Sequence, residues 1–171
     1  MSFSPDGSLL AGSITPEDRV VVWDVTRRSQ RSVLAGHKGL IPGLNFSPDG
    51  SMLASASWDG TARLWNTASG QLIASLRAQL LGVNSVDFTQ DGRRLAAGTG
   101  DGFIKLWNLE NLQEVLTLRG AGGVGVVRFL SGNETLVGAS PEAIELWVAP
   151  SLGAISRKEH LRAEEAVVSR R

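Results

Sequence analysis

The chain has 171 residues, and its 17 Lys and Arg residues balance 17 Asp and Glu residues, so the formal net charge is zero. A neutral chain lacks the positive field that attracts nucleic acid or anionic lipid, so we expect neither as a partner. The absence of cysteine excludes disulfides and thiolate metal sites, and we expect no metal and no cofactor. The sequence has no signal-peptide pattern and no apolar run of the roughly 20 residues that span a bilayer, which predicts a cytoplasmic protein without a membrane partner.

A stretch of the form FSPDG…LWN recurs four times along the chain. The copies open with a phenylalanine and carry a tryptophan further on, and these residues are Phe3, Phe46, Phe88 and Phe129, and Trp23, Trp65, Trp107 and Trp147. The phenylalanine spacings are 43, 42 and 41 residues, and the tryptophan spacings are 42, 42 and 40. A period of this length is typical of repeat proteins, whose units bury their apolar surface against their neighbours. We therefore expect the function on the surface of an array rather than in one catalytic cleft.

Each copy divides into four short strand-like segments, which in the second copy are residues 40–47, 51–57, 61–66 and 71–77. Pro48-Asp49-Gly50 and Asp59-Gly60 are turn sequences between them. This spacing of strands and turns predicts an all-β antiparallel fold. Bulky residues fall on both faces of the strands, which favours four-stranded sheets stacked on one another over a two-sheet sandwich. Residues 157–171 form a charged tail that is compatible with a helix.

These features resemble the WD-repeat β-propeller family. The second copy carries the family's Gly36-His37 pair, its turn aspartate Asp59 and its strand tryptophan Trp65, and the first carries the Trp23-Asp24 dipeptide. The resemblance covers Phe3 to about Ser156 and implies blades at approximately 3–45, 46–87, 88–128 and 129–156. The tail resembles the ends of multi-repeat bacterial WD proteins, some of which follow a Ser/Thr kinase domain.

The array begins in the middle of a first strand and has about four blades, whereas such propellers usually have about seven. Four blades leave two open edges, so we expect an incomplete ring from the C-terminal portion of a larger propeller. Further WD repeats upstream, or repeats from a second chain, would close it.

The family resemblance also implies a buried hydrogen-bond network in the second copy, formed by His37, Ser57, Asp59 and Trp65. The third copy offers Thr99, Asp101 and Trp107, with Gln79 in the place of the histidine, and the fourth copy has lost the pattern. We therefore expect the second blade to be the most rigid and the fourth the least rigid. Serine, histidine and aspartate also make hydrolase triads, but the resemblance places this serine inside a strand. We interpret the set as structural and expect no catalytic residue.

The run from Gly120 to Gly125 has the composition of a dinucleotide-binding loop. Such a loop requires a helix directly after the glycines. The sequence that follows is VVRF, which is typical of a strand. A degenerate loop between two blades is the better interpretation.

Trp58 directly precedes the turn aspartate of the second copy. The resemblance places this position at the rim of the top face, where partner-binding side chains gather. Trp58 is therefore a candidate partner-binding residue, and the alternative is a surface tryptophan lying across the neighbouring blade. The sequence predicts a non-catalytic scaffold that binds a protein or peptide on this face. The second hypothesis is a regulatory or substrate-docking region of a larger enzyme such as a Ser/Thr protein kinase.

Overall fold

The computed structural model describes residues 1–78, 81–130 and 135–148. These residues form strands and turns without a helix, and the strands make four antiparallel sheets. The first sheet contains β1 (Ser2–Phe3), β2 (Leu9–Ile14), β3 (Arg19–Asp24) and β4 (Ser29–Leu34). The second contains β5 (Gly43–Phe46), β6 (Met52–Ala56), β7 (Thr61–Asn66) and β8 (Leu72–Arg77). The third contains β9 (Val83–Phe88), β10 (Arg94–Thr99), β11 (Phe103–Asn108) and β12 (Gln113–Arg119), and the fourth contains β13 (Val126–Phe129), β14 (Thr135–Ala139) and β15 (Ile144–Val148).

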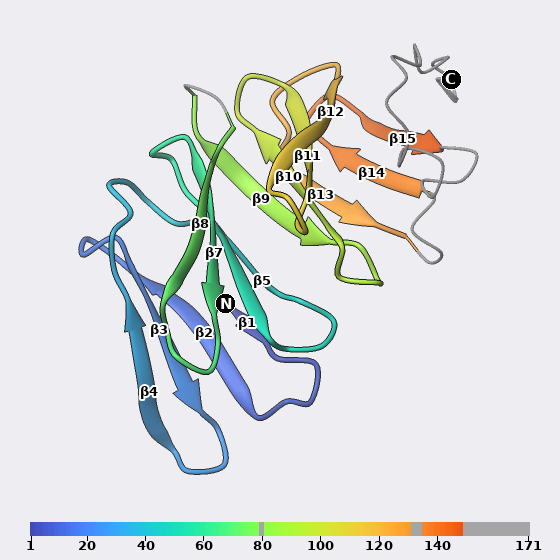
Figure 1. Cartoon of the computed structure of the whole chain (residues 1–171). Helices are drawn as coiled ribbons and strands as arrows, with labels where there is room; N and C mark the ends of the chain where they lie inside the picture. Colours follow the sequence, from blue (N-terminus) through green and yellow to red (C-terminus); the bar gives the residue numbers. More distant parts are fainter. Residues whose placement is uncertain (79–80, 131–134, 149–171) are drawn as a thin grey trace.

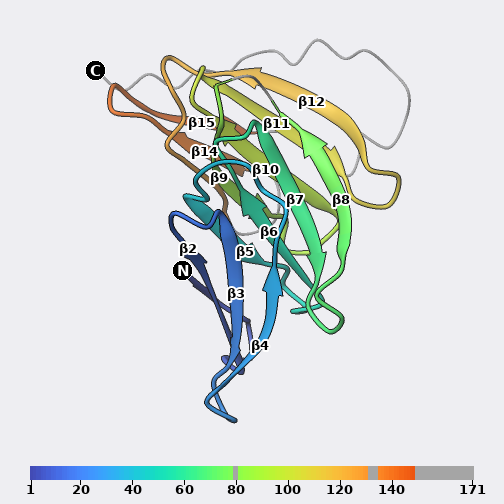
Figure 2. The ribbon, with the colours of Figure 1, turned by 90° about the vertical axis from the view of Figure 1, so that its left-hand side faces the viewer.

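Within each sheet the strands pair in chain order, as an up-and-down meander. The sheets succeed one another like the leaves of a fan, from the blue first sheet to the orange fourth sheet (Figure 1). The first strands of successive sheets, β1, β5, β9 and β13, lie beside one another. The view turned by 90° shows the second and third sheets stacked as separate layers (Figure 2). The fan formed by the described sheets does not close, so the predicted all-β fold of consecutive propeller blades in an incomplete ring is confirmed.

The turn between the first two strands follows one design in the first three sheets. In the second sheet, Ser47 Oγ donates a hydrogen bond of 2.6 Å to Asp49 Oδ1, which also accepts the backbone N–H of Ser51 at 3.0 Å. The hydrogen bond from Ser47 is the main reason that the pKa of Asp49 lies below its ordinary value. Gly50 completes the turn with a φ of 72°, a conformation that favours glycine. The predicted Pro-Asp-Gly turn is therefore confirmed.

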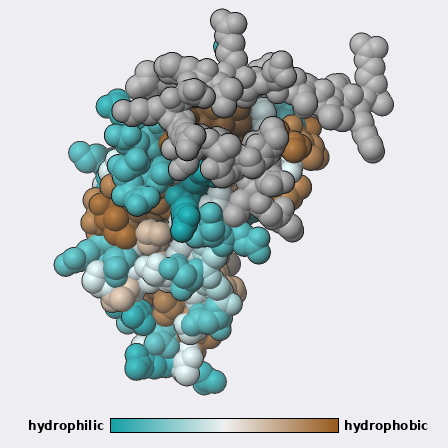
Figure 3. Space-filling model, turned by 45° about the vertical axis from the view of Figure 1, so that its right-hand side comes forward, coloured by the Kyte–Doolittle hydropathy of each residue, from teal (hydrophilic) through white to brown (hydrophobic). Residues whose placement is uncertain are grey.

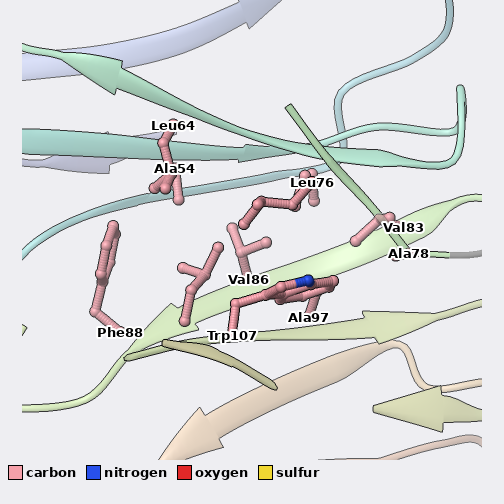
Figure 4. Close-up of a cluster of buried hydrophobic side chains, with 12 residues drawn as sticks. Ala54, Leu64, Leu76, Ala78, Val83, Val86, Phe88, Ala97 and Trp107 are labelled. Carbon is pink, nitrogen blue, oxygen red and sulfur yellow. The ribbon is translucent and has the colours of Figure 1, made fainter. Parts of the chain in front are cut away.

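The apolar core lies between the sheets. One buried cluster combines alanines and leucines of the second sheet with the phenylalanine and tryptophan of the third (Figure 4): its labelled members are Ala54, Leu64, Leu76, Ala78, Val83, Val86, Phe88, Ala97 and Trp107. A similar cluster joins the first sheet to the second, and another joins the third to the fourth. Trp65 lies on β7 and Trp107 on β11, in different sheets, as stacking of consecutive blades requires.

The sheets begin between one and five residues before the positions at which we placed the blade limits. The second sheet starts at Gly43 rather than at Phe46, because the phenylalanine ends the first strand of its sheet. The tail at 157–171 and Gln79 lie outside the described residues.

Candidate functional site

A hydrogen-bond chain runs through the second sheet from its core to its rim. The indole N–H of Trp65 on β7 donates to Ser55 Oγ at 2.8 Å, and Ser55 Oγ lies 2.7 Å from His37 Nε2. His37 Nδ1 lies 2.8 Å from Asp59 Oδ2 in the β6–β7 turn. Asp59 also accepts hydrogen bonds from the Thr61 hydroxyl at 2.6 Å and the backbone N–H of Lys38 at 3.0 Å. The chain therefore ties the β4–β5 loop to β6, to β7 and to the turn between them.

A neutral histidine satisfies all the hydrogen bonds in this chain. An indole N–H only donates, so the Ser55 hydroxyl accepts from Trp65 and donates its own proton to His37 Nε2. His37 Nδ1–H then donates to Asp59. Burial lowers the pKa of His37 below its ordinary value, although the hydrogen bond and the charge of Asp59 oppose this effect. Burial alone would raise the pKa of Asp59, but hydrogen bonds from Thr61, His37 and Lys38 prevail and lower it to about 2.

Ser55, and not Ser57, is the serine of this network, so our assignment of Ser57 was wrong. Ser57 lies at the turn, where its hydroxyl donates to the carbonyl of Gly39 at 2.9 Å and accepts the N–H of Asp59 at 3.1 Å. The error was one of register. The hairpin pairs Leu53 with Trp65 and Ser55 with Arg63, so Ser55 is the diagonal neighbour of the tryptophan on the same face. The Asp59-Gly60 turn carried this information, since it fixes which residues oppose one another.

Ser55, His37 and Asp59 have the connectivity of a hydrolase triad, but Ser55 cannot meet a substrate. The serine is fully buried in the middle of β6, and only 1% of the His37 side chain is exposed. The lone pair that an attacking hydroxyl would use is directed at the Trp65 indole. A nucleophilic serine stands instead on an exposed, strained turn. The set is a structural clamp.

The other sheets lack the hydroxyl that this network needs. The positions equivalent to Ser55 are Gly12, Ala97 and Gly138, because each is two residues beyond the partner of its tryptophan. In the third sheet, Thr99 Oγ1 donates to Asp101 at 2.5 Å, but it also bonds the backbone of Phe103 and belongs to the turn. Trp107 is buried, and the hydroxyl of Thr99 is engaged by Asp101 and the Phe103 backbone rather than by the indole. Thr99 and Asp101 therefore meet in the turn, whereas Trp107 pairs with Leu95, four residues before Thr99, and the chain seen in the second sheet is not formed.

Trp58 lies across the neighbouring sheet and is also exposed. Its indole N–H donates to Asn84 Oδ1 on β9 at 3.1 Å, and Asn84 Nδ2 donates to the carbonyl of Val124 at 3.0 Å. A Cβ placed on Gly82 would lie 3.0 Å from Trp58 Cα, so the backbone packs closely beneath the side chain. The residue still exposes 55% of its surface. The predicted contact of Trp58 with the neighbouring sheet is therefore confirmed, and partner binding at this residue stays a prediction.

Asp87 on β9 links the first strands of three sheets, a role that the sequence analysis did not identify. Asn45 on β5 donates its side-chain N–H to Asp87 Oδ1, and the backbone N–H of Phe129 donates to Asp87 Oδ2 at 2.6 Å. Burial raises the pKa of Asp87, while the bond from Phe129 and the nearby charge of Arg128 oppose that effect. The signal was present in the repeat, because Asn45 and Asp87 both directly precede the phenylalanine of their copy.

The remaining sequence features that we considered are the glycine-rich run, metal ligands and membrane-spanning segments. The glycine-rich run continues into β13 and not into a helix, so it connects two blades as predicted. Within residues 1–78, 81–130 and 135–148, no three His, Cys, Asp or Glu side chains gather to hold a metal ion. The same residues include no helix with the length and apolar character to cross a bilayer.

Comparison with known families agrees with the repeat. The family model described as "WD domain, G-beta repeat" matches residues 28–66 and 70–108. These two segments of the chain are therefore similar to WD repeats. Each matched WD repeat starts just before or at the last strand of one sheet and ends with the third strand of the next, so 28–66 holds β4 to β7 and 70–108 holds β8 to β11. The repeat unit in the sequence is therefore offset from the sheet by one strand, which ties neighbouring sheets together covalently.

Three curated proteins are also similar to this chain over part of its length. The "Periodic tryptophan protein 2 homolog" of Neurospora crassa is 35% identical over 66 residues, which is 39% of this chain and 7% of that protein. The "Guanine nucleotide-binding protein subunit beta-2" of Caenorhabditis elegans is 43% identical over 65 residues, 38% of this chain and 17% of that protein. "Ribosome assembly protein 4" of Chaetomium thermophilum is 36% identical over 63 residues, 36% of this chain and 12% of that protein. The matches thus span less than a fifth of each relative, and these relatives are eukaryotic, which gives no support to the bacterial origin that we expected from the tail.

Proposed function

We propose that the whole described chain is a series of WD-repeat blades that serves as a non-catalytic scaffold and binds a protein or peptide on the rim around Trp58. The two matched repeats and the continuation of the same sheet design to β3 and β15 support the extension to all four sheets. WD-repeat relatives support an interaction role. A cytoplasmic location stays a prediction of the sequence.

The observation that carries the binding proposal is that Trp58 is exposed and yet held in place. The Asn84 hydrogen bond and the packing on Gly82 fix the indole before any partner arrives. A side chain that is already ordered loses little entropy on binding, and tryptophan is enriched among residues that dominate interface energies. Leu40 and Leu81, exposed at 39% and 69%, come from the adjoining loops, and Trp58 N bonds to the Leu40 carbonyl at 2.9 Å. We call Leu40, Trp58 and Leu81 the rim patch.

The rim patch fits a peptide with a large apolar side chain. The apolar side chains supply contact area, and the amide of Asn84 and the backbone of the surrounding loops supply polar groups at the margin of the patch. This arrangement of an apolar centre with a polar border is typical of small protein-binding surfaces. The second hypothesis, a docking region of a kinase, gains no support, since none of the relatives named above is a kinase by its name.

A displayed random peptide library selected on the 171-residue chain tests the proposal. The selected peptides are measured by calorimetry on the parent chain and on Trp58→Ala, with Leu72→Ala as the control, because Leu72 is similarly exposed but lies at the other end of its sheet. We expect Trp58→Ala to weaken binding about 30-fold, which corresponds to about 2 kcal/mol, and Leu72→Ala to leave it unchanged. Peptides that bind the parent chain and Trp58→Ala equally would contradict the proposal.

A further inference from the structure

The three buried junctions between sheets are built to one rule. In each, aliphatic residues of the third strand of the earlier sheet cover the phenylalanine and tryptophan of the later sheet. Ala62 and Leu64 share a cluster with Phe88 and Trp107, and the same positions recur on either side: Val20 and Val22 with Phe46 and Trp65, and Ile104 and Leu106 with Phe129 and Trp147. In these junctions, the aliphatic face of a sheet therefore contacts the next sheet in chain order, and the aromatic face contacts the preceding sheet.

The first sheet has an aromatic face that no other described sheet covers. Phe3 and Trp23 are the repeat equivalents of Phe46 and Trp65, since Phe3 opposes Leu10 and Leu10 opposes Trp23. Phe46 and Trp65 are 5% and 2% exposed, whereas Phe3 and Trp23 are 60% and 44% exposed. Burying an aromatic side chain of this size contributes about 1.5–3 kcal/mol, so this face has a large unused affinity for a matching surface.

The fourth sheet has the complementary aliphatic face, which no other described sheet covers. Ile144 and Leu146 on β15 occupy the positions of Ala62 and Leu64, three residues and one residue before the tryptophan of their sheet. They are 71% and 43% exposed. The side chains of Trp147 and Ile144 point to opposite faces of β15, because side chains alternate along a strand. Trp147 packs on the third sheet, so Ile144 and Leu146 face away from it.

One chain thus carries both halves of its own interface, at opposite ends of the fan (Figure 1). The space-filling view also shows hydrophobic residues exposed as separate patches among hydrophilic ones (Figure 3). We propose that a second copy of this chain docks head to tail, with the aromatic face of one copy on the aliphatic face of the other. Each such junction repeats the three that the chain already makes internally, so it needs no new kind of contact.

The number of copies follows from the geometry of propellers. A head-to-tail contact either closes into a ring or grows into a filament. Rings of four-stranded blades close with about four to eight blades. Two copies of four sheets give eight and form both junctions, whereas three copies give twelve, which exceeds the range. For the 171-residue chain by itself, the proposal therefore predicts a dimer.

Sedimentation equilibrium of the 171-residue chain over a range of concentrations tests this proposal. We expect a mass of twice 18.2 kDa at high concentration. Trp23→Asp places a charge on the aromatic face, and Ile144→Asp places one on the aliphatic face. Because every junction needs one face of each kind, either variant alone should remain a monomer. A mixture of the two should recover a dimer with a single junction, from the intact aliphatic face of one variant and the intact aromatic face of the other. Ile73→Asp on β8, at an exposed position away from both faces, is the control and should dimerise like the parent chain.

A parent chain that stays monomeric at every concentration, a mass that grows beyond two copies, or a dimer that survives Trp23→Asp would each overturn the proposal, and so would a mixture that fails to associate. Circular dichroism establishes that each variant is folded. Should a variant not fold, the parent chain labelled with fluorotryptophan gives a second measurement. The ¹⁹F signal of Trp23 should shift with concentration while that of Trp65 stays constant, and equal behaviour of the two would overturn the proposal.

Discussion

The carboxylate of Asp87 on β9 accepts the backbone N–H of Phe129 on β13 at 2.6 Å, and so joins two sheets that share no strand ladder. The other carboxylate oxygen accepts a side-chain N–H of Asn45 from the sheet before. A single carboxyl group thus holds the first strands of three consecutive sheets in register with one another. The stacking of the first strands β5, β9 and β13 depends on this contact as well as on apolar burial.

Two substitutions of Asp87 distinguish the stability that its hydrogen bonds supply from the stability that its charge supplies. Asp87→Ala leaves two buried donors without an acceptor, at about 1–3 kcal/mol each, and we expect the free energy of unfolding to fall by about 2–4 kcal/mol. Asp87→Asn keeps an acceptor for Phe129, and a turn of the Asn45 amide restores the other bond, so we expect less than half that loss. Urea unfolding measures both. Equal losses in the two variants would mean that the charge, and not the hydrogen bonds, supplies the stability.

The role of Ser55 is tested by the exchange of the Trp65 indole proton with solvent. Ser55→Ala removes the acceptor of that proton and a partner of His37, so we expect faster exchange and a loss of about 2–3 kcal/mol in the free energy of unfolding. Ser57→Ala is the control, because its hydroxyl bonds the turn backbone and does not touch Trp65. NMR of the indole N–H distinguishes the two. An unchanged exchange rate in Ser55→Ala would contradict the network.

His37 makes stability depend on pH in a defined direction. Its pKa is lowered in the folded protein, mainly by burial, so below the ordinary value of about 6.5 the unfolded chain binds a proton that the folded chain does not. Protonation therefore favours unfolding, and the stability that His37 contributes is complete above pH 6.5 and declines as the pH falls below it. Urea unfolding at pH 7.5 and 5.5 should show a larger acid loss for the parent chain than for His37→Gln.

Asp87 titrates in the opposite sense, since its raised pKa makes the folded state bind a proton first as the pH falls. That contribution is the same in both chains and cancels in the comparison. Identical pH dependence of the parent chain and His37→Gln would contradict a buried, neutral histidine.

Close approach of the second and third sheets is tested at Gly43. A Cβ at this position would lie 2.9 Å from the carbonyl oxygen of Asn84 and 3.1 Å from Ser85 Cα, both in the backbone of β9. Gly43→Ala should therefore cost about 1–3 kcal/mol, although alanine is otherwise less costly than glycine in a strand. Gly125→Ala is the control, because the nearest atom, the carbonyl oxygen of Ala139, would be at an ordinary 3.7 Å. Thermal unfolding of both variants measures the difference. Equal midpoints for Gly43→Ala and Gly125→Ala would exclude the close contact.

The sequence predicted what depends on local spacing. The strands, the Pro-Asp-Gly turns and the assignment of Trp65 and Trp107 to different sheets follow from a repeat whose turn residues fix each hairpin. Specific contacts between sheets could not be predicted from the sequence. Asn45 and Asp87, for example, are 42 residues apart, and their contact depends on how two sheets stack. The choice of Ser57 over Ser55 was a register error that the turn sequence could have prevented. The predicted order of blade rigidity stays a prediction, which the lack of a hydroxyl at Gly12, Ala97 and Gly138 supports.

The central claim is that the phenylalanine and tryptophan side chains of a sheet are buried against the preceding sheet in chain order. Nuclear Overhauser contacts between tryptophan rings and assigned methyl groups test it most directly. The ring of Trp107 should contact methyl groups of the second sheet from the shared cluster of Ala54, Ala56, Leu64 and Leu76, and the ring of Trp65 should contact those of Val20, Val22 and Leu34 in the first. Contacts between the two rings, or between Trp107 and the first sheet, would contradict the account.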